Sequence, residues 1–197
     1  MIRMHEIKDP FEKFHEWYDE AKRSSHTLPN AMCLSTVGAD GCPSARMVLL
    51  SSFDRRGFVF HTNYESRKAA ELAAIPRAAL LFWWESLNRQ VRIEGPVERT
   101  SPDESDAYFA GRARGSQLGA WASSQSRPPP PGETLEGRMR RYEERFKDLP
   151  VPRPPHWGGY RLLPRAFEFW TGSEDRLHER IRYDRTPDRW TVTLLDP

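Results

Sequence analysis

The sequence predicts a mainly β protein, a small antiparallel barrel of about six strands with helices packed around it. Two observations predict this fold. Short β-prone runs alternate with turn residues through the first half of the chain, and helix-period stretches then precede further β-prone runs near the C-terminus. A length of 197 residues suffices for one substantial core, so we expect a single domain over residues 1–197.

The first predicted element is a helix over residues 9–25. Asp9 is a suitable N-cap, and Pro10 stands in the first turn, where its missing N–H costs nothing. Apolar side chains recur at helical spacing along one face, which we expect to pack on the core. They are Phe11, Phe14, Trp17, Tyr18 and Ala21.

Three strands are predicted next, over residues 31–37, 44–51 and 57–62. The turn sequences of residues 38–41 (GADG) and 54–57 (DRRG) separate them. Turns this short join neighbouring antiparallel strands, so the three strands form a meander.

The two cysteines are not expected to form a disulfide. If residues 38–41 make the turn, Val37 faces Cys42 and Cys33 faces Arg46. The two sulfur atoms then lie roughly 13 Å apart, which is too far for a bridge. Two free thiols fit an intracellular protein.

The remaining elements follow from the same signals. Strands are predicted over residues 78–84, 90–99, 157–163, 166–171 and 190–194. Helices are predicted over residues 67–74, 102–112, 115–124 and 133–147. The proline-rich residues 127–132 are predicted to form a rigid surface connector, with a ligand for an SH3-like partner as the alternative, and residues 150–155 form a second extended linker.

Composition excludes several functional classes. The chain has 30 basic and 28 acidic residues and a net charge of +2, so no global field would recruit nucleic acid. It has no apolar run near the ~20 residues that span a bilayer, and its first ten residues lack the hydrophobic stretch of a signal peptide. We therefore expect a soluble, cytoplasmic protein without a membrane partner. Metal-binding spacings and Rossmann or Walker motifs are also absent, so neither type of site is expected.

Two helix starts carry local positive charge. Ser66, Arg67 and Lys68 combine a hydroxyl and two cations with the free N–H groups of a helix N-terminus, which favours a bound anion. The alternative is a pair of solvent-facing cations. A second helix start, at Ser116, lies beside two arginines, Arg112 and Arg114.

The C-terminal segment of residues 167–184 (FEFWTGSEDRLHERIRYD) concentrates further basic groups. As an extended segment it places Arg176, His178 and Arg180 on one face, whereas a helix would separate His178 from both arginines. Gly172 and the β-prone residues after Arg180 favour the extended form. Such a face suits an anionic planar ligand, and the alternative is a solvated edge strand.

The motif Glu168-Phe169-Trp170 followed by 176–180 (RLHER) closely resembles the C-terminal signature of pyridoxine/pyridoxamine 5'-phosphate oxidases. The resemblance runs through several motifs in the same order, from about Asp9 to Pro197. It implies an FMN-binding split β-barrel and a homodimer with FMN at the two-fold interface.

The resemblance also assigns residues to roles. It implies FMN contacts at Arg46, Met47, Val48, Leu49, Leu50, His61, Thr62, Ser66, Arg67, Lys68, Gln90, Gln125, Ser126, Trp170 and Arg180. It implies substrate contacts at Ser51, Tyr108, Arg112, Ser116, Arg176 and His178. Within the second set, Tyr108, Arg112 and Ser116 clamp the substrate phosphate, while Arg176 and His178 are the catalytic pair that holds the pyridine ring over the flavin.

The implied activity is that of an oxidoreductase, a flavoprotein of vitamin B6 metabolism that makes pyridoxal 5'-phosphate from pyridoxamine or pyridoxine 5'-phosphate. In this chemistry the C4' carbon loses a hydride to the flavin, and molecular oxygen reoxidises the flavin with release of hydrogen peroxide. The cofactor carries the redox step while the protein positions and polarises the substrate.

Three features depart from the family pattern. His61 stands where an aromatic Tyr or Phe is usual, the segment before Asp9 is short, and Ser51 occupies the position of a phosphate-binding lysine. The substrate phosphate is therefore expected to depend mainly on Arg112, Tyr108 and Ser116. Two alternatives remain: a related flavoenzyme of the phenazine-biosynthesis type that acts on another aromatic substrate, and a non-catalytic module that binds FMN or pyridoxal phosphate.

Overall fold

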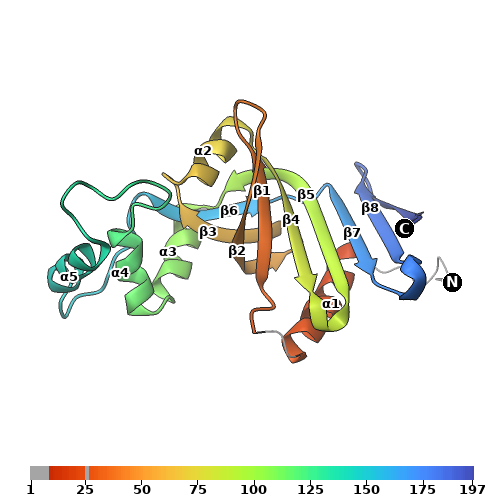
Figure 1. The fold of residues 1–197 in the computed structure, drawn as a ribbon, viewed down its shortest axis with the longest axis horizontal. Coiled ribbons are helices and arrows are strands. Elements are labelled where there is room, and N and C mark those ends of the chain that lie inside the picture. Colours follow the sequence, from red (N-terminus) through yellow and green to blue (C-terminus); the bar gives the residue numbers. More distant parts are fainter. Residues whose placement is uncertain (1–8, 25–26) are drawn as a thin grey trace.

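A closed six-stranded antiparallel barrel forms the centre of the computed structural model, which describes residues 9–24 and 27–197 (Figure 1). The strands follow the order β4-β1-β2-β3-β6-β5, and pairing of β4 with β5 closes the ring. They are β1 (Ala31–Val37), β2 (Pro43–Asp54), β3 (Gly57–Asn63), β4 (Arg77–Trp84), β5 (Arg89–Arg99) and β6 (Trp157–Leu162). The predicted barrel is confirmed.

The long strand β5 holds the barrel and an extension together. Residues 97–99 pair with β6, whereas residues 89–94 pair with β7 (Ala166–Thr171) on the same side. The sheet then continues through β8 (Glu179–Arg185) to β9 (Trp190–Leu195). The C-terminal strands therefore leave the barrel as a separate hairpin arm.

Helix α1 (Pro10–Arg23) packs against the barrel, as the apolar stripe predicts. The side chain of Asp9 accepts a hydrogen bond from the backbone N–H of Phe11 at 2.9 Å, which confirms the N-cap. Phe14 is fully buried and meets Phe53 and Phe58 edge to face, with ring centroids 4.9 and 4.8 Å away. The predicted end of this helix, Ser25, lies outside the described residues.

Four further helices complete the described fold: α2 (Arg67–Ala74), α3 (Pro102–Ala110), α4 (Arg114–Ala122) and α5 (Leu135–Arg145). Figure 1 shows α3, α4 and α5 grouped at one end of the long axis and the β7–β8 hairpin at the other. The helical group has its own apolar cluster, which includes Phe109, Leu118 and Trp157. None of the helices in the described part of the chain is long and apolar enough to cross a membrane.

The predicted register of the first hairpin is wrong by one residue. Val37 faces Pro43 and Cys33 faces Met47, because the loop has five residues rather than four. Gly38 N–H donates to the carbonyl oxygen of Cys42 at 2.9 Å, so Cys42 belongs to the loop, and Gly41 adopts a left-handed φ of 79°. Both cysteines are free.

The predicted extended segment from Arg176 to Arg180 is also wrong in part. A 3₁₀ turn, η3 (Glu174–Arg176), connects β7 to β8, and Arg176 has a left-handed φ of 58°. The strand begins only at Glu179. Of the three basic residues that the sequence places on one face, Arg180 alone lies on the strand, because the hairpin connection requires a turn where the sequence pattern shows only alternation.

Candidate active site

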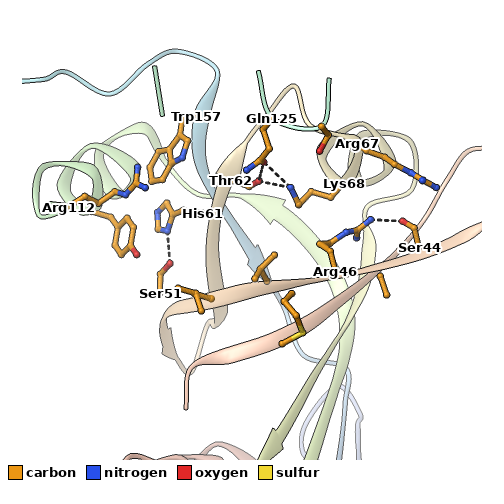
Figure 2. Close-up of a pocket in the computed structure, with 16 residues that line it drawn as sticks. Ser44, Arg46, Ser51, His61, Thr62, Arg67, Lys68, Arg112, Gln125 and Trp157 are labelled. Atoms are coloured by element: carbon orange, nitrogen blue, oxygen red, sulfur yellow. Dashed lines mark hydrogen bonds between the residues drawn. The ribbon is translucent and has the colours of Figure 1, made fainter. Parts of the chain in front are cut away.

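A pocket of about 660 Å³ lies over β2 and β3, between α2 on one side and α3 on the other (Figure 2). Most of the predicted cofactor and phosphate residues line it. These are Arg46, Met47, Val48, Leu49, Ser51, His61, Thr62, Arg67, Lys68, Tyr108, Arg112, Gln125 and Ser126. The sequence therefore predicted most of this wall, although the residues come from segments up to 80 positions apart (46 to 126).

One end of the pocket is cationic and centres on Lys68. Its ammonium donates to Gln125 Oε1 at 2.9 Å, Thr62 Oγ1 at 3.1 Å and Ser66 Oγ at 3.2 Å, all of them neutral oxygens. Burial, followed by the nearby Arg46 charge, lowers the pKa of Lys68 to about 8. A cation held in this way gains from a bound anion, because the anion would supply the charge compensation that neutral oxygens lack.

A buried carboxylate, Glu71, arranges the other cations at this end. It accepts hydrogen bonds from Ser44 Oγ at 2.7 Å, from Arg46 Nη2 at 2.9 Å and from Arg67 Nε at 2.8 Å, and a further bond from Thr36. Burial alone would raise the pKa of Glu71, but these donors together lower it to about 2. The permanent negative charge fixes both arginines beside the pocket.

The opposite end of the pocket is aromatic. The imidazole of His61 stacks on Tyr108 with ring centroids 3.9 Å apart and lies 5.1 Å from the ring of Trp157. Its Nδ1 is 2.8 Å from Ser51 Oγ. The guanidinium of Arg112 sits 4.7 Å over Trp157, and its buried Nη1 has no hydrogen-bond partner among the described residues. Stacking thus holds Arg112, and none of the described residues satisfies this buried donor.

A second group of predicted residues lies on the C-terminal arm. Gln90, Trp170 and Arg180 form one row across β5, β7 and β8. The ring of His178 packs 4.6 Å from that of Trp170, and its Nδ1 accepts from Ser173 N at 3.3 Å. None of these residues lines the pocket of the single chain, and neither does Arg176.

Three other predicted residues do not line the pocket of the single chain. The side chain of Leu50 is buried in the barrel core and cannot reach a pocket ligand. Ser66 is the N-cap residue of α2, but its side chain makes no capping hydrogen bond, because its hydroxyl donates to the carbonyl oxygen of Asn63 at 2.7 Å. Ser116 is exposed on α4 and does not line the pocket.

Two important residues of this site, Trp157 and Glu71, carry little functional signal in the sequence. Trp157 forms the aromatic wall beside His61, and its only sequence signal is its position at the start of a predicted strand. Glu71 looks like an ordinary helix residue in the sequence, and only the approach of α2 to β1 and β2 reveals its role. The described residues contain no cluster of three or more side chains suited to a metal ion.

Comparison with known proteins assigns this arrangement to a family. Residues 18–146 match the model described as pyridoxamine 5'-phosphate oxidase, and residues 157–197 match the pyridoxine 5'-phosphate oxidase C-terminal dimerisation region. The chain belongs to the pyridoxamine 5'-phosphate oxidase family.

Curated relatives of the family agree over nearly the whole chain. Proteins named pyridoxine/pyridoxamine 5'-phosphate oxidase from Rubrobacter xylanophilus and Cupriavidus necator are each 57% identical to this chain. The alignments cover 96% of this chain and 87% and 89% of the relatives.

Two solved structures have the same fold as this chain. PhzG from Burkholderia lata, in complex with tetrahydrophenazine-1-carboxylic acid, has a TM-score of 0.92 at 32% identity and covers 100% of this chain, with 98% of PhzG aligned. A related FMN binding protein from Nostoc punctiforme has a TM-score of 0.78 at 19% identity, covering 97% of this chain and 100% of that one, which indicates the shared fold alone.

The lowered pKa of Glu71 predicts a pH-dependent contribution to stability. The folded-state pKa of about 2 lies below the ordinary value of 4.5, so the stabilisation is present above pH 4.5 and is lost as the pH falls toward 2. Glu71→Gln should therefore lower the free energy of unfolding at pH 7 by up to about 3 kcal/mol.

Urea unfolding of wild type and variant at several pH values checks this expectation. The difference in the free energy of unfolding between wild type and variant should decrease as the pH falls below 4.5. Glu65→Gln is the matched control, because Glu65 is 54% exposed and its one ion pair within the described part of the chain is with the exposed Arg127. A difference in the free energy of unfolding that stays constant down to pH 3 would contradict a stabilising role of the Glu71 charge.

Proposed function

We propose that this chain is an FMN-dependent oxidase that converts pyridoxamine 5'-phosphate, pyridoxine 5'-phosphate or both to pyridoxal 5'-phosphate, with molecular oxygen as electron acceptor and hydrogen peroxide as product. The observation that carries the proposal is that both ends of one pocket have cationic side chains suited to binding an anion. Lys68 and Arg67 form one end, and Arg112, whose buried Nη1 has no partner among the described residues, forms the other. A phosphorylated cofactor and a phosphorylated substrate need two such ends.

The residues present fit FMN at the Lys68 end. Lys68 is only 8% exposed, and its hydrogen-bond partners are neutral, which suits a buried phosphate. Arg67 and the free N–H groups at the start of α2 add further donors. On β2, the exposed side chains of Met47 and Leu49 offer an apolar surface beside this end, which suits a flat ring system.

Bound FMN would supply a hydride acceptor at this site. The protein's own part is to bind and orient the substrate. Arg112 would hold the substrate phosphate through charge-assisted hydrogen bonds, and Tyr108, stacked on His61, would close the same end. Nδ1 of His178 accepts a hydrogen bond from the backbone N–H of Ser173. The ring hydrogen of neutral His178 therefore lies on Nε2, which can donate a hydrogen bond to a substrate atom.

The chain would work as a homodimer with FMN at the interface. This proposal is supported by the separation of the pocket from the C-terminal arm. Helix α3, at one end of the pocket, and the β7–β8 hairpin lie at opposite ends of the long axis in Figure 1. An isologous dimer would bring the arm of one subunit to the pocket of the other. Arg176, His178, Gln90, Trp170 and Arg180 would then complete the partner's site.

A phenazine-type activity is the second candidate, because PhzG resembles this chain over its full length. The lower identity of PhzG, 32% against 57% for the named oxidases, favours the vitamin B6 reaction. The retained Arg112 also favours a phosphorylated substrate. A non-catalytic binding module would show no turnover with either substrate class.

Peroxide production tests the proposed reaction directly. The purified FMN-loaded protein should oxidise pyridoxamine 5'-phosphate, and Arg112→Ala should raise KM for it roughly ten- to a hundredfold through loss of a charge-assisted bond. Unphosphorylated pyridoxamine should be a far poorer substrate that Arg112→Ala does not alter further. Turnover that is indifferent to Arg112 would remove the vitamin B6 assignment.

Affinity for the cofactor tests the Lys68 end. Lys68→Ala should weaken FMN binding roughly ten- to a hundredfold, because a charge-assisted hydrogen bond to the phosphate is lost. Riboflavin, which lacks the phosphate, should bind both proteins equally weakly, as fluorescence quenching would measure. Lys147→Ala, at an exposed position, is the control. Equal affinity of wild type for riboflavin and FMN would place the phosphate elsewhere.

Subunit complementation tests the shared site. Arg112→Ala and His178→Ala should each lower kcat/KM for pyridoxamine 5'-phosphate, roughly tenfold or more, while FMN stays bound. If each site takes Arg112 from one subunit and His178 from the other, mixed dimers contain one intact site. Co-expression of the two variants with different tags should then restore about a quarter of wild-type sites on random pairing. Absence of any recovery would place both residues in the same subunit's site.

A further inference from the structure

Two residues that depart from the family pattern, Ser51 and His61, contact each other. Ser51 lies in a β-bulge of β2: Leu50 pairs with Phe60 and Ser52 with Val59, so Ser51 has no partner on β3. A bulge re-aims the side chain of its extra residue. Here it directs Ser51 Oγ to 2.8 Å from Nδ1 of His61, at the aromatic end of the pocket that both residues line (Figure 2).

The surroundings of His61 keep its imidazole neutral. Burial, and next the positive charge of Arg112, lower its pKa to about 4, with Arg153 lowering it further and Glu104 opposing them. Tyr108 stacks on one face of the ring at 3.9 Å, and Trp157 lies beside this stack, 5.1 Å from His61 and 6.2 Å from Tyr108. At neutral pH the site therefore has no second cation at His61.

The hydrogen-bonding partners assign the tautomer. Nε2 of His61 is buried, has no hydrogen-bond partner among the described residues and faces Gly159, where even a Cβ would come within 3.0 Å of it. A buried N–H without an acceptor costs more free energy than a buried lone pair without a donor. The ring hydrogen of His61 therefore lies on Nδ1, and Nε2 keeps the lone pair. Nδ1–H then donates to Ser51 Oγ, and the hydroxyl hydrogen of Ser51 is left free to donate elsewhere.

We propose that His61 is a positioning residue that turns the Ser51 hydroxyl into the pocket as a neutral donor to the phosphate monoester of the substrate, beside the guanidinium of Arg112. The inference rests on the proposed function and deepens it. Arg112 lines the same end of the pocket, and its Nη1 has no hydrogen-bond partner among the described residues, so its charge lies on the side of the pocket where the Ser51 hydroxyl donates. Ser51 and His61 together offer the substrate phosphate an oriented neutral hydrogen-bond donor in place of a second positive charge.

Kinetics of four variants test the pair. Ser51→Ala removes the donor and should raise KM for pyridoxamine 5'-phosphate about two- to tenfold with kcat unchanged. His61→Phe keeps a stacking ring but loses Nδ1–H, and it should raise the same KM by no more than Ser51→Ala does. The double variant should equal Ser51→Ala, because His61 acts through Ser51. His61→Asn restores a side-chain N–H at the Nδ1 position and should recover part of the loss.

The control is Ser52→Ala, one residue along β2, which does not line the pocket. Unphosphorylated pyridoxamine should respond to none of these variants. Additive effects of Ser51→Ala and His61→Phe, or equal effects on phosphorylated and unphosphorylated substrate, would overturn the inference. So would ¹⁵N chemical shifts that place the hydrogen of His61 on Nε2.

A binding measurement separates this inference from the proposed reaction. Pyridoxal 5'-phosphate and pyridoxal are titrated calorimetrically into the FMN-loaded wild type and Ser51→Ala proteins. Failure of the wild type to oxidise either vitamer would defeat the proposed function, yet a two- to tenfold weaker affinity of Ser51→Ala for pyridoxal 5'-phosphate alone would still support the donor role. Equal affinities of the two proteins for pyridoxal 5'-phosphate would defeat the inference even in an active oxidase.

Discussion

The buried carboxylate of Glu71 is the constraint on which the cationic end of the pocket depends. It joins three elements, because its donors come from β1 (Thr36), β2 (Ser44 and Arg46) and α2 (Arg67). A buried charge must be compensated, so α2 can dock on the barrel only where these donors meet it. That docking places the first turn of α2, and Lys68 with it, over the pocket.

The two ends of the pocket use different physical means to attract an anion. At the α2 end, several cations lie close together: burial, followed by the charge of Arg46, lowers the pKa of Lys68, and Glu71 opposes this effect. At the other end, the Arg112 guanidinium is held against Trp157 beside the neutral imidazole of His61. The first end therefore suits a permanently bound cofactor phosphate, whereas the second suits a substrate phosphate that must leave after turnover.

A single chain presents the pocket but not the whole predicted site. The strand pairing of β5 explains this separation, because one part of β5 closes the barrel with β6 and the other part carries β7 and β8 away from it. Arg180 is held on that arm by Glu168 at 2.9 Å, so its position is set before any partner arrives. The match of residues 157–197 to a dimerisation region supports a homodimer in which this arm takes part.

The sequence predicted the element order and the barrel through strand and helix periodicity, and it predicted most of the residues that line the pocket through its resemblance to the family. It did not determine features that depend on which strands meet. The five-residue loop before Pro43 shifted the first register, and the turn at Arg176 broke the predicted extended face. The bulge at Ser51 and its contact with His61 were decided only by the pairing of β2 with β3, since hydrogen-bond register and side-chain packing are properties of neighbours in space, which the order of residues along the chain does not specify.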